Sequence, residues 1–119
     1  MPNYKYSHEH LMSPNPEKTA DFYVKMFGAK IDRVVKLPSG GVSLFLNLNG
    51  TTIVVSERPQ PPFGLDHFGI ATDNLDTTVK ELKSAGYKFT MEITAISPKT
   101  RIAFFQAPDN ALIELVEEK

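Results

Sequence analysis

Three histidines and one isolated carboxylate offer the most distinctive chemistry in this sequence. His8 and His10 lie two residues apart in the strand-like segment 4–12, so their side chains would share one face of a β-strand. His67 lies in a second strand-like segment, 65–71. The chain has no cysteine, which excludes a thiolate nucleophile and leaves nitrogen and oxygen atoms as the only metal ligands.

Glu114 is the carboxylate, and it interrupts the apolar segment 111–116. A charged side chain inside such a strand is costly unless it is paired or coordinated. One interpretation is a strand whose polar face meets solvent, as the neighbouring Glu117-Glu118 pair indicates. The other makes Glu114 the third ligand, beside His8 and His67, of a two-histidine, one-carboxylate site. Such a site suits a divalent metal and leaves positions open for water or substrate.

The elements that must position these residues begin with the strand over 4–12. A helix should start at Asn15-Pro16-Glu17, where Asn caps and Pro suits the first helical position, and end at Gly28. Three strands are then predicted over 29–37, 42–48 and 51–57, the last two joined by a tight turn at Asn49-Gly50. The proline-rich segment 58–64 cannot continue a strand ladder and should be a linker.

After the linker the same order of elements begins again. The sequence predicts a strand over 65–71, a helix from Asp73-Asn74 to a stop at Gly86, and strands over 88–96, 100–107 and 111–117, with a turn at Pro108-Asp109-Asn110. His67 follows His8 by 59 residues, Asn74 follows Asn15 by 59, and the two hairpin turns are 60 apart. This near-constant offset predicts two copies of one βαβββ module, over 4–57 and 65–118, in a single domain of residues 1–119.

The offset also pairs the residues with chemistry. His8 and His67 fall at equivalent points on the first strand of each module, and two histidines at matched positions favour function over a purely structural role. The position equivalent to Glu114 is Val54, which cannot coordinate a metal. Ser56 shares the face of Val54 on the predicted strand.

Three stretches of the chain resemble the vicinal oxygen chelate superfamily. They are Ser7-His8-Glu9-His10-Leu11 with Asn15-Pro16-Glu17-Lys18, Leu65 to Ala71 with Asn74-Leu75-Asp76, and Phe104 to Leu115. Glyoxalase I, methylmalonyl-CoA epimerase, extradiol dioxygenases, fosfomycin-resistance transferases and bleomycin-resistance proteins belong to this superfamily. The resemblance covers about Tyr4 to Glu117. It implies an α+β fold in which two βαβββ modules pair, with curved mixed sheets around a metal-binding cleft.

The resemblance also implies a ligand set. It makes His8, His67 and Glu114 ligands of one divalent ion, which would be Fe, Mn, Ni, Zn or Co, and it places the family's fourth position on Val54. Glyoxalase I has a glutamate there that is both ligand and proton-abstracting base, whereas extradiol dioxygenases and fosfomycin-resistance enzymes use three ligands. Glu114 and His10 are the candidate catalytic residues. His10 could be an additional ligand, a general base near the metal or a wall of the pocket.

Composition excludes other classes of function. The 119 residues include 13 basic and 14 acidic ones, so nothing in the charge balance favours nucleic-acid binding. No apolar stretch approaches the roughly 20 residues of a membrane span, and the N-terminus lacks the apolar core of a signal peptide, so we expect a cytoplasmic protein. Lys99 and Arg101 either hold an anionic group of a substrate or form a solvated hairpin.

Three classes of function fit these features. The first is a divalent-metal-dependent enzyme, similar to lactoylglutathione lyase or to a dioxygenase, acting on a small molecule that chelates the metal through its oxygens. The alternative is a metal-free small-molecule binding protein of the bleomycin-resistance type. A domain that binds metal without turnover is a third possibility. In each case the resemblance implies a homodimer and a small-molecule partner.

Overall fold

The computed structural model describes residues 2–119. Within this range it has eight strands and two α-helices, and the order βαβββ occurs twice. The chain divides into two compact units. The N-terminal unit comprises His8–Asp66, and the C-terminal unit comprises residues 67–119 together with residues 2–7.

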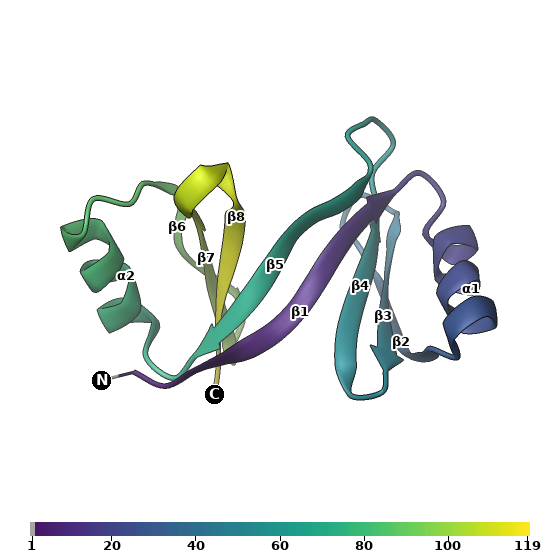
Figure 1. The fold of residues 1–119 in the computed structure, drawn as a ribbon, viewed down its shortest axis with the longest axis horizontal. Coiled ribbons are helices and arrows are strands. Elements are labelled where there is room, and N and C mark those ends of the chain that lie inside the picture. The colour runs from purple at the N-terminus through teal and green to yellow at the C-terminus, as the bar shows by residue number, and fades with distance from the viewer. Residues whose placement is uncertain (1) are drawn as a thin grey trace. The chain divides into compact units, whose positions relative to one another are not determined.

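The N-terminal unit is a four-stranded mixed sheet with one helix. Its elements are β1 (Tyr4–Ser13, in this unit from His8), α1 (Pro16–Phe27), β2 (Lys30–Lys36), β3 (Val42–Leu48) and β4 (Thr51–Glu57). The strand order is β2-β3-β4-β1, with β1 parallel to β4 and the other pairs antiparallel. Helix α1 packs against β2, β3 and β4 (Figure 1). The core between them consists of Ala20, Ala29, Leu44, Leu46, Ile53 and Val55.

The C-terminal unit repeats this plan. Its elements are β5 (Gly64–Thr72, in this unit from His67), α2 (Leu75–Ser84), β6 (Phe89–Ser97), β7 (Thr100–Gln106) and β8 (Leu112–Glu118), with a short 3-10 turn at Pro108–Asn110. The order is β5-β8-β7-β6, with β5 parallel to β8 and the other pairs antiparallel. Helix α2 packs against β6, β7 and β8 (Figure 1). Its core consists of Leu75, Val79, Ala103, Phe105, Ile113 and Leu115.

The two helix starts match at the level of single hydrogen bonds. Lys18 N–H donates to the side-chain oxygen of Asn15 at 3.2 Å, and Thr77 N–H donates to that of Asn74 at 3.1 Å. Each asparagine therefore satisfies one of the free N–H groups of a first helical turn, as the sequence predicts. A pair of hydroxyls supports each start, Ser13 with Thr19 and Thr72 with Thr78. This correspondence confirms the predicted repeat of strand end and helix start.

The predicted turns are confirmed by their backbone angles. Asn49 and Gly50 have φ of 50° and 97°, as a type I′ turn requires. Asp109 and Asn110, at the equivalent turn, also have positive φ. Helix α1 ends at Phe27, and its cap Gly28 has the left-handed conformation, whereas α2 ends at Ser84 with Ala85 as its cap. Gly86, the predicted stop, lies just beyond that cap.

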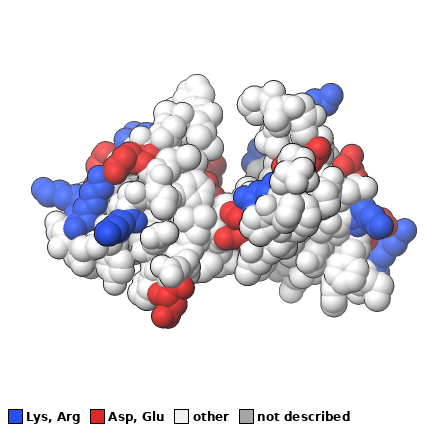
Figure 2. Space-filling view, turned by 90° about the horizontal axis from the view of Figure 1, so that it is seen from above, with Lys and Arg blue, Asp and Glu red and all other residues white. Residues whose placement is uncertain are grey.

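Charged side chains of both signs are interspersed on the visible face of each unit (Figure 2). This mixture agrees with the formal net charge of −1. Within residues 2–119 no helix has the length and apolar character needed to span a membrane.

Candidate metal centre

His67 and Glu114 meet in the C-terminal unit. Ile113 and Leu115 face the core under α2, so strand alternation turns Glu114 to the opposite face of β8. There its Oε1 lies 3.2 Å from Nε2 of His67, and the two residues are only 9% and 6% exposed. The ring of Phe104 packs edge-on against the His67 ring, with centroids 5.0 Å apart. The predicted proximity of His67 and Glu114 is thus seen within one unit.

His8 and His10 lie together in the N-terminal unit. Both are half-buried on β1, and their ring centroids are 5.9 Å apart in an edge arrangement. A ring nitrogen of His8 lies within 4.8 Å of one of His10. The predicted sharing of one face by these two histidines follows from their spacing of two on a regular strand.

Val54 occupies the position predicted for it. Ile53 and Val55 belong to the core under α1, so Val54 faces the other side of β4, as Glu114 does on β8. The strand register makes the equivalence explicit: Val54 pairs with His10 on β1, and Glu114 pairs with Gly69 on β5.

Two buried serines lie next to His10. Ser56 Oγ is 2.6 Å from His10 Nε2 and is hydrogen-bonded in turn to Ser43 Oγ on β3. Ser43 and Ser56 are 5% and 6% exposed, so this chain of polar atoms is shielded from water. The sequence placed Ser56 on the face of Val54, but it gave no sign of the contact with Ser43, which depends on the pairing register of β3 and β4.

The donor set fits a divalent cation. Imidazole and carboxylate are the ligands expected for Mn, Fe, Co, Ni and Zn. Two donors each about 2.1 Å from one ion lie about 3.0 Å apart at a right angle and about 3.4 Å apart at the tetrahedral angle. The 3.2 Å between His67 Nε2 and Glu114 Oε1 falls within that range.

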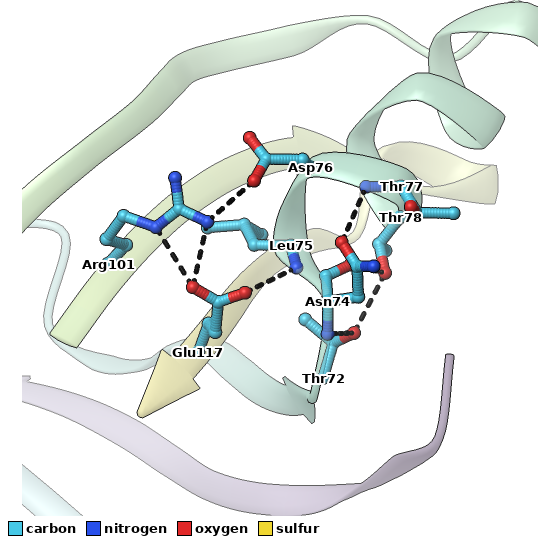
Figure 3. Close-up of polar contacts among 8 residues, drawn as sticks. All are labelled: Thr72, Asn74, Leu75, Asp76, Thr77, Thr78, Arg101 and Glu117. Atoms are coloured by element: carbon cyan, nitrogen blue, oxygen red, sulfur yellow. Dashed lines mark hydrogen bonds and ion pairs between the residues drawn. The ribbon is translucent and has the colours of Figure 1, made fainter. Parts of the chain in front are cut away.

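The sequence interpretation placed Glu117 wrongly. It was expected at a partly solvated strand end, but it is 5% exposed, whereas Glu118 is exposed. Its Oε2 accepts a hydrogen bond from the N–H of Leu75, the first residue of α2, at 2.8 Å. Its Oε1 accepts two from Arg101, at 2.9 and 2.8 Å, and Arg101 also contacts Asp76 at 2.9 Å (Figure 3). Arg101 thus links two carboxylates, those of Glu117 and Asp76, at the start of α2.

These contacts govern the charge state of Glu117. Burial alone would raise the pKa of its carboxyl group. The hydrogen bonds from Leu75 and Arg101 act in the other direction and outweigh burial, so the pKa of Glu117 lies below its ordinary value. The hydrogen bond from Arg101 likewise lowers the pKa of Asp76. The cluster is charged at neutral pH and stabilises the start of α2.

Comparison with known proteins identifies the family. The model of the Glyoxalase/Bleomycin resistance protein/Dioxygenase superfamily matches residues 5–115. The chain belongs to this superfamily. The resemblance inferred from the sequence motifs is therefore confirmed over almost the whole chain.

Individual relatives agree with this assignment. The chain is 29% identical over 126 residues to the mitochondrial methylmalonyl-CoA epimerase of Homo sapiens, a match covering 95% of this chain and 72% of the epimerase. It is 28% identical over 123 residues to lactoylglutathione lyase of Escherichia coli O157:H7, covering 94% and 91%. A hypothetical protein from Bacillus halodurans C-125 has the same fold, with a TM-score of 0.84 at 22% identity over 98% of this chain and 96% of that one. The predicted glyoxalase-type α+β fold is confirmed.

Proposed function

We propose that the protein is a divalent-metal-dependent enzyme of the lyase or isomerase kind, acting on a small substrate that presents two neighbouring oxygens to the metal. His8, His67 and Glu114 are the proposed ligands, and Glu114 and His10 are the proposed catalytic residues. The observation that carries the proposal is the buried pair of His67 and Glu114, whose donor atoms lie 3.2 Å apart.

A buried histidine beside a buried carboxylate requires an explanation, because both side chains are costly to remove from water. Their mutual hydrogen bond satisfies one atom of each. A shared cation would explain why both lie on the face of the sheet that points away from the α2 core, where the neighbouring β8 residues are apolar. Their burial would also keep bulk water from the reacting atoms.

The proposed chemistry is movement of a proton at a carbon next to a carbonyl group. A bound divalent metal would polarise the two substrate oxygens and stabilise negative charge that develops on them. Glu114 has two carboxylate oxygens, so one can remain beside His67 while the other accepts the proton from carbon and later returns it. Phe104 packs against the His67 ring and restricts its rotation, which would keep that side chain in place during the transfer.

Support for a lyase or isomerase, rather than a dioxygenase, comes from the named relatives. Methylmalonyl-CoA epimerase and lactoylglutathione lyase both match more than nine-tenths of this chain. These names make their substrates the first compounds to test. We also propose that the protein is a cytoplasmic homodimer. Size-exclusion chromatography with light scattering would test the dimer by measuring the molar mass in solution.

Metal content is the deciding measurement. Protein purified without chelators is expected to hold about one divalent ion per chain, and added Ni, Mn, Fe or Zn should raise the melting temperature of the metal-depleted protein. His67→Ala and Glu114→Gln should lose both the bound ion and the stabilisation by added metal. His67→Ala should still give the circular dichroism spectrum of a folded protein. Wild-type protein that holds no ion and gains no stability from any of these metals would contradict the proposal and favour metal-free binding.

The reaction is tested separately with metal-loaded protein. The hemithioacetal of glutathione and methylglyoxal, methylmalonyl-CoA and catechols represent the three classes of chemistry. We expect turnover of one of the first two, accompanied by incorporation of solvent deuterium at the reacting carbon, and loss of turnover in Glu114→Gln. Ring cleavage of a catechol with uptake of oxygen would contradict the lyase or isomerase assignment.

A further inference from the structure

The same pairing position in the two units carries one side chain that is able to bind a metal. In the C-terminal unit it is Glu114 on β8, which pairs with Gly69 on β5. In the N-terminal unit the equivalent residues are Val54 on β4 and His10 on β1, which pair with each other. The donor is thus on the last strand of one unit and on the first strand of the other. Gly69 has no side chain and Val54 has a short aliphatic one, so neither supplies a donor at its pairing position.

Two buried hydroxyl groups lie next to His10. Ser43 and Ser56 form a buried hydrogen-bonded pair, and Ser56 Oγ lies 2.6 Å from Nε2 of the imidazole. The register gives Ile102 and Val116 as the equivalent pair in the C-terminal unit. At this pair of positions, hydroxyl side chains therefore occur in the unit that has His10, and aliphatic side chains occur in the other unit.

The hydrogen bond to Ser56 is compatible with the tautomer of His10 that carries its proton on Nε2. If Nε2–H donates to Ser56 and the Ser56 hydroxyl donates to Ser43, the lone pair of the ring is on Nδ1. A histidine that binds a metal through one nitrogen commonly donates the other N–H to a fixed acceptor, which orients the ring and raises its basicity. His8 presents a second imidazole on the same face of β1.

We propose that His10 is a metal ligand in the N-terminal unit, binding through Nδ1 beside His8, and that Ser56 and Ser43 orient it. This inference rests on the proposed metal-dependent function and assigns to His10 the place that Val54 leaves without a donor.

The test is metal affinity, measured on metal-depleted protein by competition with a chromophoric chelator for Ni²⁺ and Zn²⁺. His10→Ala should weaken binding by at least about 100-fold, more than loss of an orienting group usually does. Visible absorption of the Co²⁺ form should change as well, since the coordination number falls. A His10→Ala protein that binds as tightly as wild type, while His67→Ala does not bind, would overturn this inference and leave the proposed function intact. No binding by wild type would instead refute the proposed function, and this inference with it.

Moving the donor back provides a second test. In His10→Ala/Val54→Glu the carboxylate stands at the position equivalent to Glu114, and most of the lost affinity should return. His10→Ala/Val54→Leu is the matched control and should not recover. Equal affinities of these two double variants would contradict the exchange of donors between β1 and β4.

Ser56 gives a test that leaves His10 in the chain. Ser56→Ala should weaken metal binding by roughly 10- to 100-fold, and Ser56→Thr, which keeps the hydroxyl, should restore it. A role for Ser56 in folding alone would lower the melting temperature of the metal-free protein without changing affinity, and that outcome would contradict the orienting role. This measurement also decides the proposal should His10→Ala fail to fold.

Discussion

Helix α1 begins with Pro16, and α2 begins at the equivalent position with Leu75. Proline has no N–H, so α1 has one fewer donor to satisfy, and Glu57 at the end of β4 is exposed. Leu75 has an N–H, and Glu117, which stands 60 residues after Glu57, is buried and accepts its hydrogen bond. The comparison teaches that the buried carboxylate is found at the helix start that has an N–H to satisfy, 42 positions before it in the chain, and not at the start that has a proline.

The two units also differ in residue type on the face of each sheet that points away from its helix. Glu114 lies opposite Gly69, whereas Val54 lies opposite His10. The pair Ser43 and Ser56, which contacts His10, is replaced by Ile102 and Val116. The two units have equivalent cores and helix caps and differ at the positions that could carry chemistry. The two units therefore provide matched controls for each other.

The cores should give the largest effects. Leu115, which is 2% exposed, and Val55, which is 0% exposed, occupy equivalent positions under α2 and α1. Leu115→Ala should lower the free energy of unfolding by about 3 kcal/mol and Val55→Ala by roughly 2 kcal/mol, because fewer buried carbon atoms are removed. Urea denaturation measures both. Val34→Ala, on the exposed side of β2, is the control and should change it by less than about 0.5 kcal/mol.

The helix starts should differ next. Glu117→Ala leaves the Leu75 N–H and the Arg101 guanidinium without their acceptor and should cost about 2 to 3 kcal/mol. Glu57→Ala, at the equivalent and exposed position, should cost less than about 0.5 kcal/mol. Equal losses in these two variants, measured by urea denaturation, would show that Glu117 has no special role at α2.

The contribution of Glu117 to stability should depend on pH. The pKa of Glu117 is lower in the folded protein than its ordinary value of 4.5, so its charge contributes stability above that pH. This contribution is lost as the pH falls below 4.5 and through the lower folded-state pKa. The stability gap between wild type and Glu117→Gln should therefore narrow in acid. The deficit of Leu115→Ala should stay constant over the same pH range, and a constant gap for Glu117→Gln would contradict the assignment.

Much of this architecture could be predicted because it is encoded locally. Asn15-Pro16, Asn74, Asn49-Gly50 and Gly28 each specify a backbone geometry within a few residues, and the offset of 59 to 60 extends each observation to the other unit. Strand alternation then turned His67 and Glu114 away from the helix-covered face. Their 3.2 Å contact agrees with that parity.

Features that depend on long-range register could not be predicted. The environment of Glu117 depends on Arg101 from β7 and Leu75 from α2, and a Glu-Glu sequence gives no indication of either contact. Likewise, Ser43 and Ser56 become a pair only when β3 and β4 align. The assignment of His8, His67 and Glu114 as metal ligands, with Glu114 and His10 as catalytic residues, remains a prediction for the metal measurements to decide.

The caps provide the smallest predicted effect, and it should be equal in the two units. Asn15 and Asn74 make the same hydrogen bond to a backbone N–H three residues on, at 3.2 and 3.1 Å, and both are exposed. Each substitution by alanine should therefore cost about 1 kcal/mol in urea denaturation, and each substitution by aspartate only a few tenths. A loss at Asn74 much larger than at Asn15 would mean that the Arg101 and Glu117 cluster depends on the cap. A smaller loss at Asn74 would mean that the Arg101 and Glu117 cluster stabilises the start of α2 even without the cap, so that α1 relies more on its asparagine.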